Sequence, residues 1–367
     1  MVDDRVPEDS RYTPNASPAA LEAERITRRD EAERERVAET VSFAAQRRLK
    51  FDAVRHLMPR WSAKLGWGVV IVGLITLFGL IGPYFVQDPH DSDNPALLPP
   101  GPGHPLGTTK LGYDVLAQLA WGTRGSLFIG LVAGVVTLVL AILFGILAGY
   151  FGGVLDEFLT LGTNIMLVIP GLPLVMVIAA YFQNTPGLGP LARSSLLIAL
   201  ILGVTSWAGS AVVLRAQAKS LRTREYVAAA KVAGERPMRV IFVEILPNLV
   251  PLIAAQFIFG IIFAVLGEAG LSYLGLGPTG SITLGTMLND AQTGQAVGTG
   301  AWWWFVPPGA IIALLGAGLS LINFAIDEVI DPKLRLAPKA ARSQRQAERR
   351  AAKRASQNKA AKDGVPA

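Results

Sequence analysis

The chain contains no cysteine and only three histidines, and these shortages exclude several kinds of site. Without cysteine there is no structural disulfide and no cysteine-ligated metal. The histidines have no His/Glu spacing on a shared helical face, so they offer no metal ligand set. A Gly-rich loop followed by Lys and Ser or Thr, which would bind ATP phosphates, is also missing. The sequence therefore predicts no metal site, no cofactor and no ATP hydrolysis in this chain.

Charged residues are scarce at 17%, whereas apolar residues make up 51% and gather in long runs. A hydrocarbon core of about 30 Å requires roughly 20 residues of helix. Six runs meet that length, at residues 65–86, 126–150, 159–182, 194–214, 249–266 and 303–326. We expect an all-α membrane protein with six transmembrane helices. A cleavable signal peptide is not expected, because about sixty polar residues precede the first run.

Lysine and arginine are distributed asymmetrically around these runs. Of the 34, 31 precede the first run, lie between the fourth and fifth, or follow the sixth; the others are Lys110, Arg124 and Arg193. Because basic residues are retained on the cytoplasmic side, both termini and the loop at 222–248 are expected there. The triplet of Trp302, Trp303 and Trp304 is expected to anchor the sixth helix at the outer interface.

The two ends of the chain differ in composition from its middle. Residues 1–48 are polar and charge-rich, and predict a partly disordered cytoplasmic tail. Residues 49–64 mix apolar and basic positions, as in an amphipathic helix that lies in the inner interface. Residues 65–336 form the six-helix domain. Residues 337–367 predict a basic, disordered cytoplasmic tail near anionic lipid, an interpretation we prefer to nucleic-acid binding.

The loop at 222–248 has glycine and proline residues at positions that would start and end short helices, as expected of a docking element. The run 224–233 predicts a short helix, which Gly234 can end in a left-handed conformation. Pro237 can begin a second helix, and Pro247 is expected to close it before the next membrane span. A positively charged loop without a partner is the alternative interpretation of the same residues.

These residues resemble the coupling loop of ABC importer permeases, whose pattern is Glu-Ala-Ala, three residues, Gly, and a later Leu-Pro. The matching positions are Ala229, Ala230, Gly234, Ile245, Leu246 and Pro247, while Ala228 stands where the pattern has Glu. The preceding residues are similar to the dipeptide/oligopeptide (peptide/opine/nickel) branch, and to its C-type permease: Ser220, Leu221, Arg222, Arg224, Glu225, Tyr226 and Val227. The resemblance implies that this loop docks the ATPase subunits.

Two further segments resemble the same branch. One precedes the second span and contains His104, Pro105, Leu106, Gly107, Thr108, Gly112 and Asp114, with Thr109 and Tyr113 in place of the usual Asp and Arg. We expect His104 and Asp114 to cap and shape an ordered external loop. The other follows the expected fifth span and runs from Glu268 to Gly277. The chain departs from the branch at Leu161 and Asn164, where the family has an Arg and an Asp, which predicts the loss of an internal ion pair.

Polar residues within the expected spans are candidates for the transport pathway, because an unsatisfied polar group is costly at membrane depth. They are Gln256, Ser206, Ser210 and Asn164. For Gln256 an interhelical hydrogen bond is the alternative. Pro170 and Pro173 are expected to break or bend the third span.

The resemblance implies a multi-pass permease subunit of the plasma (inner) membrane with the type I importer fold. Its partners would be a homologous permease in a heterodimer, two cytoplasmic ATPase subunits that hold ATP and Mg, and an extracytoplasmic binding protein that delivers peptides. Nickel, opines or glutathione are alternative cargoes within the branch. A secondary transporter would need central ionisable residues and usually an internal repeat, neither of which we find. A membrane scaffold without a pathway is the other alternative.

Overall fold

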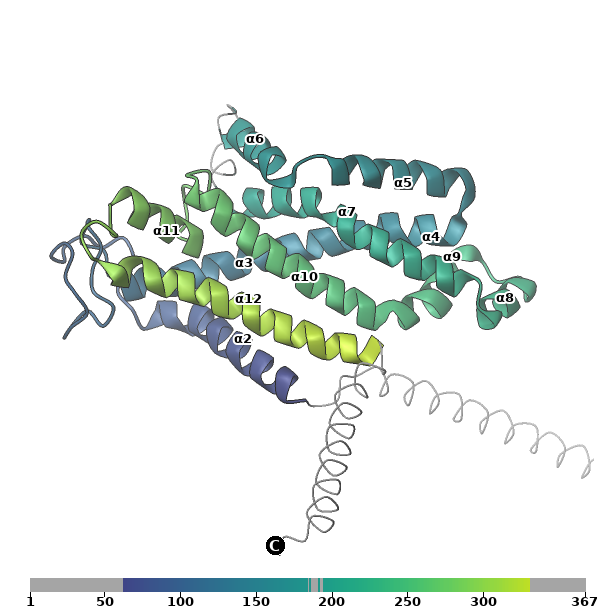
Figure 1. Ribbon diagram of the computed structural model, residues 1–367, viewed down its shortest axis with the longest axis horizontal. Helices are drawn as coiled ribbons and strands as arrows, with labels where there is room; N and C mark the ends of the chain where they lie inside the picture. The colour runs from purple at the N-terminus through teal and green to yellow at the C-terminus, as the bar shows by residue number, and fades with distance from the viewer. Residues whose placement is uncertain (1–61, 184, 186–190, 192–193, 331–367) are drawn as a thin grey trace, which may run out of the picture. The chain divides into compact units, whose positions relative to one another are not determined.

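The computed structural model describes residues 62–183, 185, 191 and 194–330, and these residues are helical apart from their connecting loops (Figure 1). The tails predicted at 1–48 and 337–367, and nearly all of the amphipathic helix predicted at 49–64, lie outside the described residues. The description begins with Ser62, whose hydroxyl accepts from the backbone N–H of Leu65 and caps the first membrane helix.

Within the described residues, five continuous helical segments are long and apolar enough to cross a membrane. Two of them pass through a π-helical segment, η2 or η4, without losing their direction. The segments are α2 with η1 (Ala63–Ile81, Gly82–Tyr84); α3, η2 and α4 (Val115–Ala141, Ile142–Ile146, Leu147–Phe151); α7 (Ser195–Arg222); α9, η4 and α10 (Pro237–Val240, Ile241–Ile245, Leu246–Tyr273); and α12 (Trp302–Ile330).

The third span of the prediction corresponds to two helices, α5 (Gly153–Val168) and α6 (Gly171–Gln183), which meet at an angle of 86°. The break falls at Ile169 and Pro170, as the prolines predict. Ile169 is extended because a residue before proline is pushed out of the α region. Pro173 lies in the first turn of α6, where backbone N–H groups have no acceptor within the helix, so the absence of an N–H in proline breaks no helical hydrogen bond. The prediction of a bend is therefore confirmed, and the bend is a sharp corner.

Pro247 does not close a helix before the next span, as the sequence had suggested. The chain continues from Pro237 to Tyr273 as one helical segment. Pro247 falls directly after the π-helical η4 (Ile241–Ile245), where the winding changes from π to α, and the helix accommodates the proline at this change without ending. The second docking helix and the fifth membrane span are thus parts of one element.

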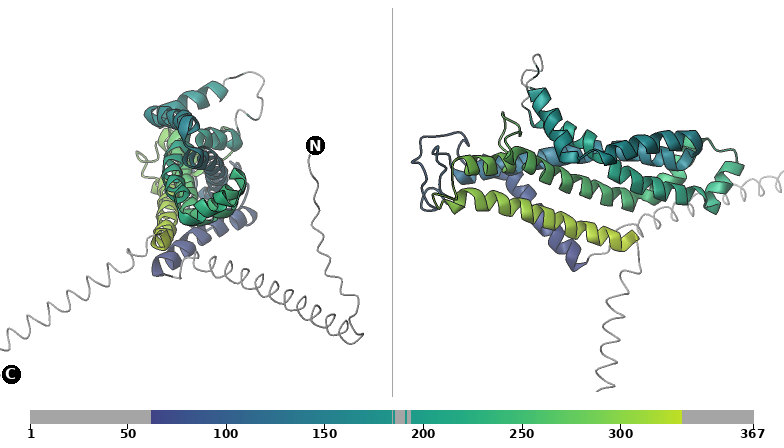
Figure 2. Two further views of the ribbon diagram at one scale, coloured as in Figure 1. Left: turned by 90° about the vertical axis from the view of Figure 1, so that its right-hand side faces the viewer. Right: turned by 45° about the horizontal axis from the view of Figure 1, so that its top comes forward.

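The helices pack through close backbone contacts. α3 lies against α7 and α10, and α12 lies between α2 and α10 (Figures 1 and 2). A Cβ atom on Gly145 would come within 2.5 Å of the Ala211 carbonyl oxygen, and one on Gly149 within 2.6 Å of the Arg215 carbonyl oxygen. Gly145 and Gly149 are four residues apart and lie on the same face of the helix. Because neither has a side chain, the backbones of this helix and α7 can approach closely.

Two short helices lie outside the spans, at opposite ends of the bundle. α8 (Glu225–Val232) follows α7, and α11 (Leu284–Thr293) follows α10 (Figure 1). α11 begins with a capping box in which the Thr283 and Thr286 side chains each bond the other's backbone. The loop that connects α2 with α3 lies at the same end of the bundle as α11.

Candidate functional site

The turn after α8 has the geometry that the sequence predicts. Gly234 has φ +80°, in the left-handed region, so the prediction for this residue is confirmed. The Glu235 N–H donates to the Ala230 carbonyl at 3.1 Å, and the Gly234 N–H donates to the Lys231 carbonyl at 3.1 Å. This pair of bonds is a Schellman motif, which satisfies the last carbonyls of a helix and turns the chain sharply. The turn leads directly to Pro237 and the start of the next span.

A buried apolar side chain fixes α8 to the bundle. Val227 is completely buried in a cluster that includes Tyr150, Leu214, Val240 and Ile245. These residues come from α4, α7, α9 and η4, and Ala230 packs against the same cluster, so the short helix joins a core built from three membrane spans. Ile245, which the sequence had placed among the docking residues, is itself fully buried. It therefore supports α8 from within and offers no surface to a partner.

Polar contacts tie the same region to α4. The Arg222 guanidinium donates to the Tyr150 carbonyl at 3.0 Å, and the Lys231 ammonium lies 5.1 Å from the centroid of the Tyr150 ring. Both cations thus hold the ends of α7 and α8 against Tyr150 in α4. A fixed position for α8 follows from this combination of one buried valine and two anchored cations.

The opposite face of α8 and its flanks are exposed and largely apolar. Val232, Met238 and Phe242 are each more than half exposed, and Tyr226 is partly exposed. Desolvation raises the pKa of the Tyr226 hydroxyl, an effect that Arg224 partly offsets, so the hydroxyl stays neutral and can donate at physiological pH. The remaining docking residues of the prediction are also at least partly exposed: Arg224, Glu225, Ala228, Ala229, Ala230, Gly234, Leu246 and Pro247.

An ion pair that the sequence did not predict lies next to this region. Asp156 accepts from Arg215 Nε at 2.5 Å and from Arg215 Nη2 at 2.8 Å, which joins the first turn of α5 to α7. Leu161 and Asn164, where the branch carries its own charges, are both exposed. No local spacing could connect Asp156 with Arg215, because they are 59 residues apart and meet only in the folded bundle.

The four residues proposed for the pathway differ in exposure. Ser206 and Asn164 are exposed, and Ser210 and Gln256 are partly exposed. In the part of the chain that the structure describes, none of their side chains forms a hydrogen bond, so the interhelical bond considered for Gln256 is not present there. Polar side chains left open on membrane helices are accounted for by a neighbouring subunit or a water-filled path. Their role in a pathway stays a prediction.

At the other end of the bundle, the loop between α2 and α3, which the sequence predicts to be external, is ordered by capping. Asp114 accepts from the Ala117 N–H at 2.8 Å and begins α3, and its second oxygen lies 2.7 Å from His104 Nδ1. The prediction that these two residues cap and shape a loop is confirmed. Because of this cap, α3 begins at Val115, eleven residues before the apolar run does.

Two members of the tryptophan triplet make contacts within the chain. The Trp303 indole N–H donates to the Thr108 carbonyl at 3.2 Å, and Trp304 is only 3% exposed. Trp302 alone is more than half exposed. Trp304 therefore packs inside the chain, whereas Trp302 and Trp303 keep exposed surface, and their role as interfacial anchors stays a prediction. An isolated apolar run carries no sign of such long-range contacts.

Glu268 lies inside α10, whereas the sequence had placed it after the fifth span. Its carboxylate is completely buried and accepts from three hydroxyls: Ser126 at 3.1 Å, Ser272 at 2.6 Å and Thr283 at 2.6 Å. Ser126 also accepts from the Leu284 N–H at 3.0 Å. The carboxylate thus joins α3, α10 and the start of α11 at one point.

The sequence also matches known transport proteins. Residues 141–336, more than half of the chain, match the family described as the inner membrane component of binding-protein-dependent transport systems. The chain belongs to this family. The permease is 32% identical to the dipeptide transport system permease protein DppC of Haemophilus influenzae, over 73% of this chain and 90% of that protein.

Other relatives are equally well covered. The DppC protein of Bacillus subtilis is 32% identical over 77% of the permease and 86% of its own length. The oligopeptide transport system permease protein OppC of Mycobacterium tuberculosis is 30% identical over 80% of the permease and 97% of its own length. The permease is therefore a non-catalytic, multi-pass component of the inner membrane that works with a binding protein and with ATPase subunits, which carry the ATP.

Proposed function

We propose that this permease forms half of a translocation pathway for dipeptides or oligopeptides, with a homologous permease as the other half. The relatives that cover most of its length are named as permeases of dipeptide and oligopeptide transport. The observation that supports the mechanism is the hydrogen-bonded turn at Gly234, which lies beside the exposed side chains of Val232, Met238 and Phe242. A docking element needs both a fixed shape and an exposed surface that a partner can contact.

The mechanism follows from the continuity of the helices. ATP-driven closure of the ATPase subunits draws two coupling loops together. Because α8 is fixed through Val227 and its turn leads into a segment unbroken from Pro237 to Tyr273, a displacement of α8 is carried into the membrane. The pathway then opens outward, and hydrolysis resets it. The ATPases act by favouring one of two arrangements of the bundle.

The test is uptake into proteoliposomes that contain the permease, its partner permease and the ATPases, with the binding protein outside. Labelled dipeptide should accumulate only when the lumen, which faces the ATPases, contains ATP and Mg. Uptake of nickel, an opine or glutathione in place of peptide would assign one of the alternative cargoes. Uptake that persists on an ion gradient without ATP would indicate a secondary transporter, and purification without any ATPase partner would indicate a scaffold.

The proposed orientation places both termini and α8 on the cytoplasmic side, and α11 with the loop between α2 and α3 outside. It is supported by the distribution of lysine and arginine, of which 31 of 34 fall on the proposed inner side.

A further inference from the structure

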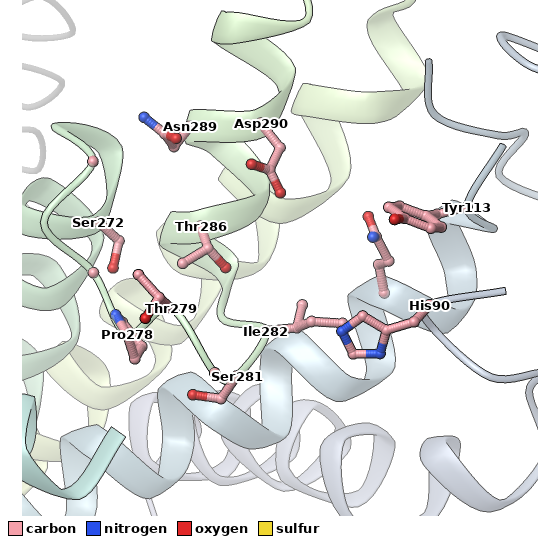
Figure 3. Close-up of a pocket in the computed structure, with 14 residues that line it drawn as sticks. His90, Tyr113, Ser272, Pro278, Thr279, Ser281, Ile282, Thr286, Asn289 and Asp290 are labelled. Carbon is pink, nitrogen blue, oxygen red and sulfur yellow. The ribbon is translucent and has the colours of Figure 1, made fainter. Parts of the chain in front are cut away.

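A cavity of ≈ 360 Å³ opens at the end of the bundle opposite α8. We call it the α11 cavity, since it is lined by α11 and by the connection from α10 to α11, with residues of the loop between α2 and α3 and of α3 opposite them (Figure 3). Its size is within the range of pockets that hold small ligands. The side chains that matter for its chemistry are His90, Tyr113, Gln118, Thr286, Asn289 and Asp290. None of the described residues that line it is a lysine or an arginine.

Gln118, one of the residues that line the α11 cavity, has a side-chain oxygen without a partner. The residue is only 4% exposed, and its Nε2 lies 3.4 Å from the Pro89 carbonyl oxygen. That contact fixes the orientation of the amide, because a carbonyl can only accept. Gln118 Oε1 is then buried without a hydrogen-bond partner among the described residues. A buried acceptor left unpaired costs free energy, which a donor from a ligand would recover.

Asp290 supplies a second acceptor, with a negative charge. Its carboxylate points from α11 into the space between Thr286 and Tyr113 (Figure 3). It forms no ion pair with any described residue. More than a third of the residue is exposed at the mouth of the cavity, and desolvation of the rest raises the pKa of its carboxyl group. A cation placed beside it would favour the ionised form.

A second cavity of ≈ 400 Å³ adjoins the first, and its charged lining residues are one cation, Arg124, and one carboxylate, Asp88. We call it the Arg124 cavity. The two cavities share four lining residues: His90, Gly280, Ser281 and Ile282. The Arg124 guanidinium lies 5.6 Å from the centroid of the Trp121 ring and forms no ion pair with a described residue. An arginine supported by an aromatic face is suited to a carboxylate.

We propose that the two adjoining cavities bind the two charged ends of a short peptide as it is received by the permease. The α-ammonium group lies between Gln118 Oε1 and the Asp290 carboxylate, and the terminal carboxylate pairs with Arg124. The inference rests on the proposed function, because it assigns the peptide's contacts on this subunit. It adds a recognition of free peptide termini that belongs to the permease itself.

The experiment measures the dissociation constants of three probes for the full-length permease, assembled with its partner permease in lipid nanodiscs. Ala-Ala carries both charged ends, N-acetyl-Ala-Ala lacks the ammonium, and Ala-Ala-amide lacks the carboxylate. Each capped probe should bind at least about tenfold more weakly than Ala-Ala, since each loses a charge-assisted contact.

Variants assign each end to its cavity. Asp290→Asn and Gln118→Met should weaken Ala-Ala about tenfold yet leave N-acetyl-Ala-Ala unchanged, and Arg124→Gln should weaken Ala-Ala and leave Ala-Ala-amide unchanged. Asp290→Glu and Arg124→Lys keep the charge and should recover part of the binding. Asp93→Asn and Lys110→Gln are matched controls, because they make the same charge changes on the same external loop region outside both cavities.

Several results would overturn the proposal. Equal binding of capped and free peptides, unchanged binding by Asp290→Asn in a correctly assembled variant, or no binding of Ala-Ala to the wild type would each do so. Dependence on one end alone would contradict a two-ended site. ATP-dependent peptide uptake by the wild type tests the proposed function separately. If the transporter takes up peptide but Ala-Ala does not bind in the two cavities, only the proposed binding site is refuted, and the proposed transport function stands.

Discussion

Gly234 shows how one residue sets the shape of the docking region. No atom lies within 4 Å of where its Cβ would be, so a substitution there strains the backbone without a steric clash. Gly234→Val should cost about 1 kcal/mol or more in strain and uncouple ATP hydrolysis from transport, with membrane insertion unchanged. Gly234→Asn is the matched control, because asparagine tolerates the left-handed region. Normal coupled transport by Gly234→Val would refute the role of this turn.

Glu225 is the residue that we expect to replace the missing family carboxylate at Ala228. Both positions are exposed, and they lie one helical turn apart on the same face of α8. Glu225 forms no ion pair with a described residue. Glu225→Gln should therefore weaken retention of the ATPase subunits in pull-downs, and adding Ala228→Glu should restore part of it.

Glu235→Gln is the control for that comparison, since Glu235 is on the same loop but is already paired with Arg239 at 3.2 Å. If Glu225→Gln retains the ATPases as well as the wild type does, the contact is apolar or lies elsewhere, and compensation by Glu225 is wrong.

Asp290 should make stability depend on pH. Desolvation raises its pKa in the folded protein above the ordinary value of 3.8, so its contribution to stability is fully present below 3.8 and is lost as pH rises through the folded pKa. Asp290→Asn should thus unfold at the same temperature as the wild type in acid and at a higher temperature at neutral pH. Thermal unfolding across pH tests this, and a difference that is largest in acid would contradict it.

Among the helices, α11 depends on the buried Glu268 carboxylate for its position. Glu268→Leu keeps most of the side-chain volume but leaves the hydroxyls of Ser126 and Thr283 without their acceptor, at a cost of roughly 1–3 kcal/mol. Amide hydrogen exchange in α11 should accelerate. Thr293→Val is the control, because that hydroxyl bonds only to carbonyls within α11. Unchanged exchange in the Leu variant would show that α11 is held by its apolar contacts alone.

Features of single elements could be predicted from the sequence, and contacts between elements could not. The break at Pro170, the left-handed Gly234 and the cap at Asp114 each depend on a few neighbouring residues. Asp156 pairs with Arg215, and Trp303 pairs with Thr108. The residues of each pair are far apart in the sequence, so no local sequence pattern predicts the contact. The prediction that Pro247 ends a helix was wrong because the sequence alone does not show whether a proline follows the last turn of one helix or lies near the start of the next.

For the whole molecule, the orientation in the membrane is the first property to test. Reporter fusions after Arg224 and in the C-terminal tail should report cytoplasm, and fusions near Pro95 and Thr293 should report the outside, because basic residues concentrate on the inner side. A fusion pair on the wrong side would overturn the six-span topology, and with it the placement of the two cavities.

The corner between α5 and α6 has a mechanical consequence. A straight helix behaves as a strut and transmits a push along its axis, whereas two helices at 86° pivot at the joint. A force on α5, which the Asp156–Arg215 pair joins to α7, would therefore act first at the corner beside Pro170 and not along α6. Three segments reach the α8 end of the bundle without such a corner: Val115–Phe151, Ser195–Arg222 and Pro237–Tyr273. Under the proposed docking at α8, these are the struts that would carry a displacement to the opposite end of the bundle.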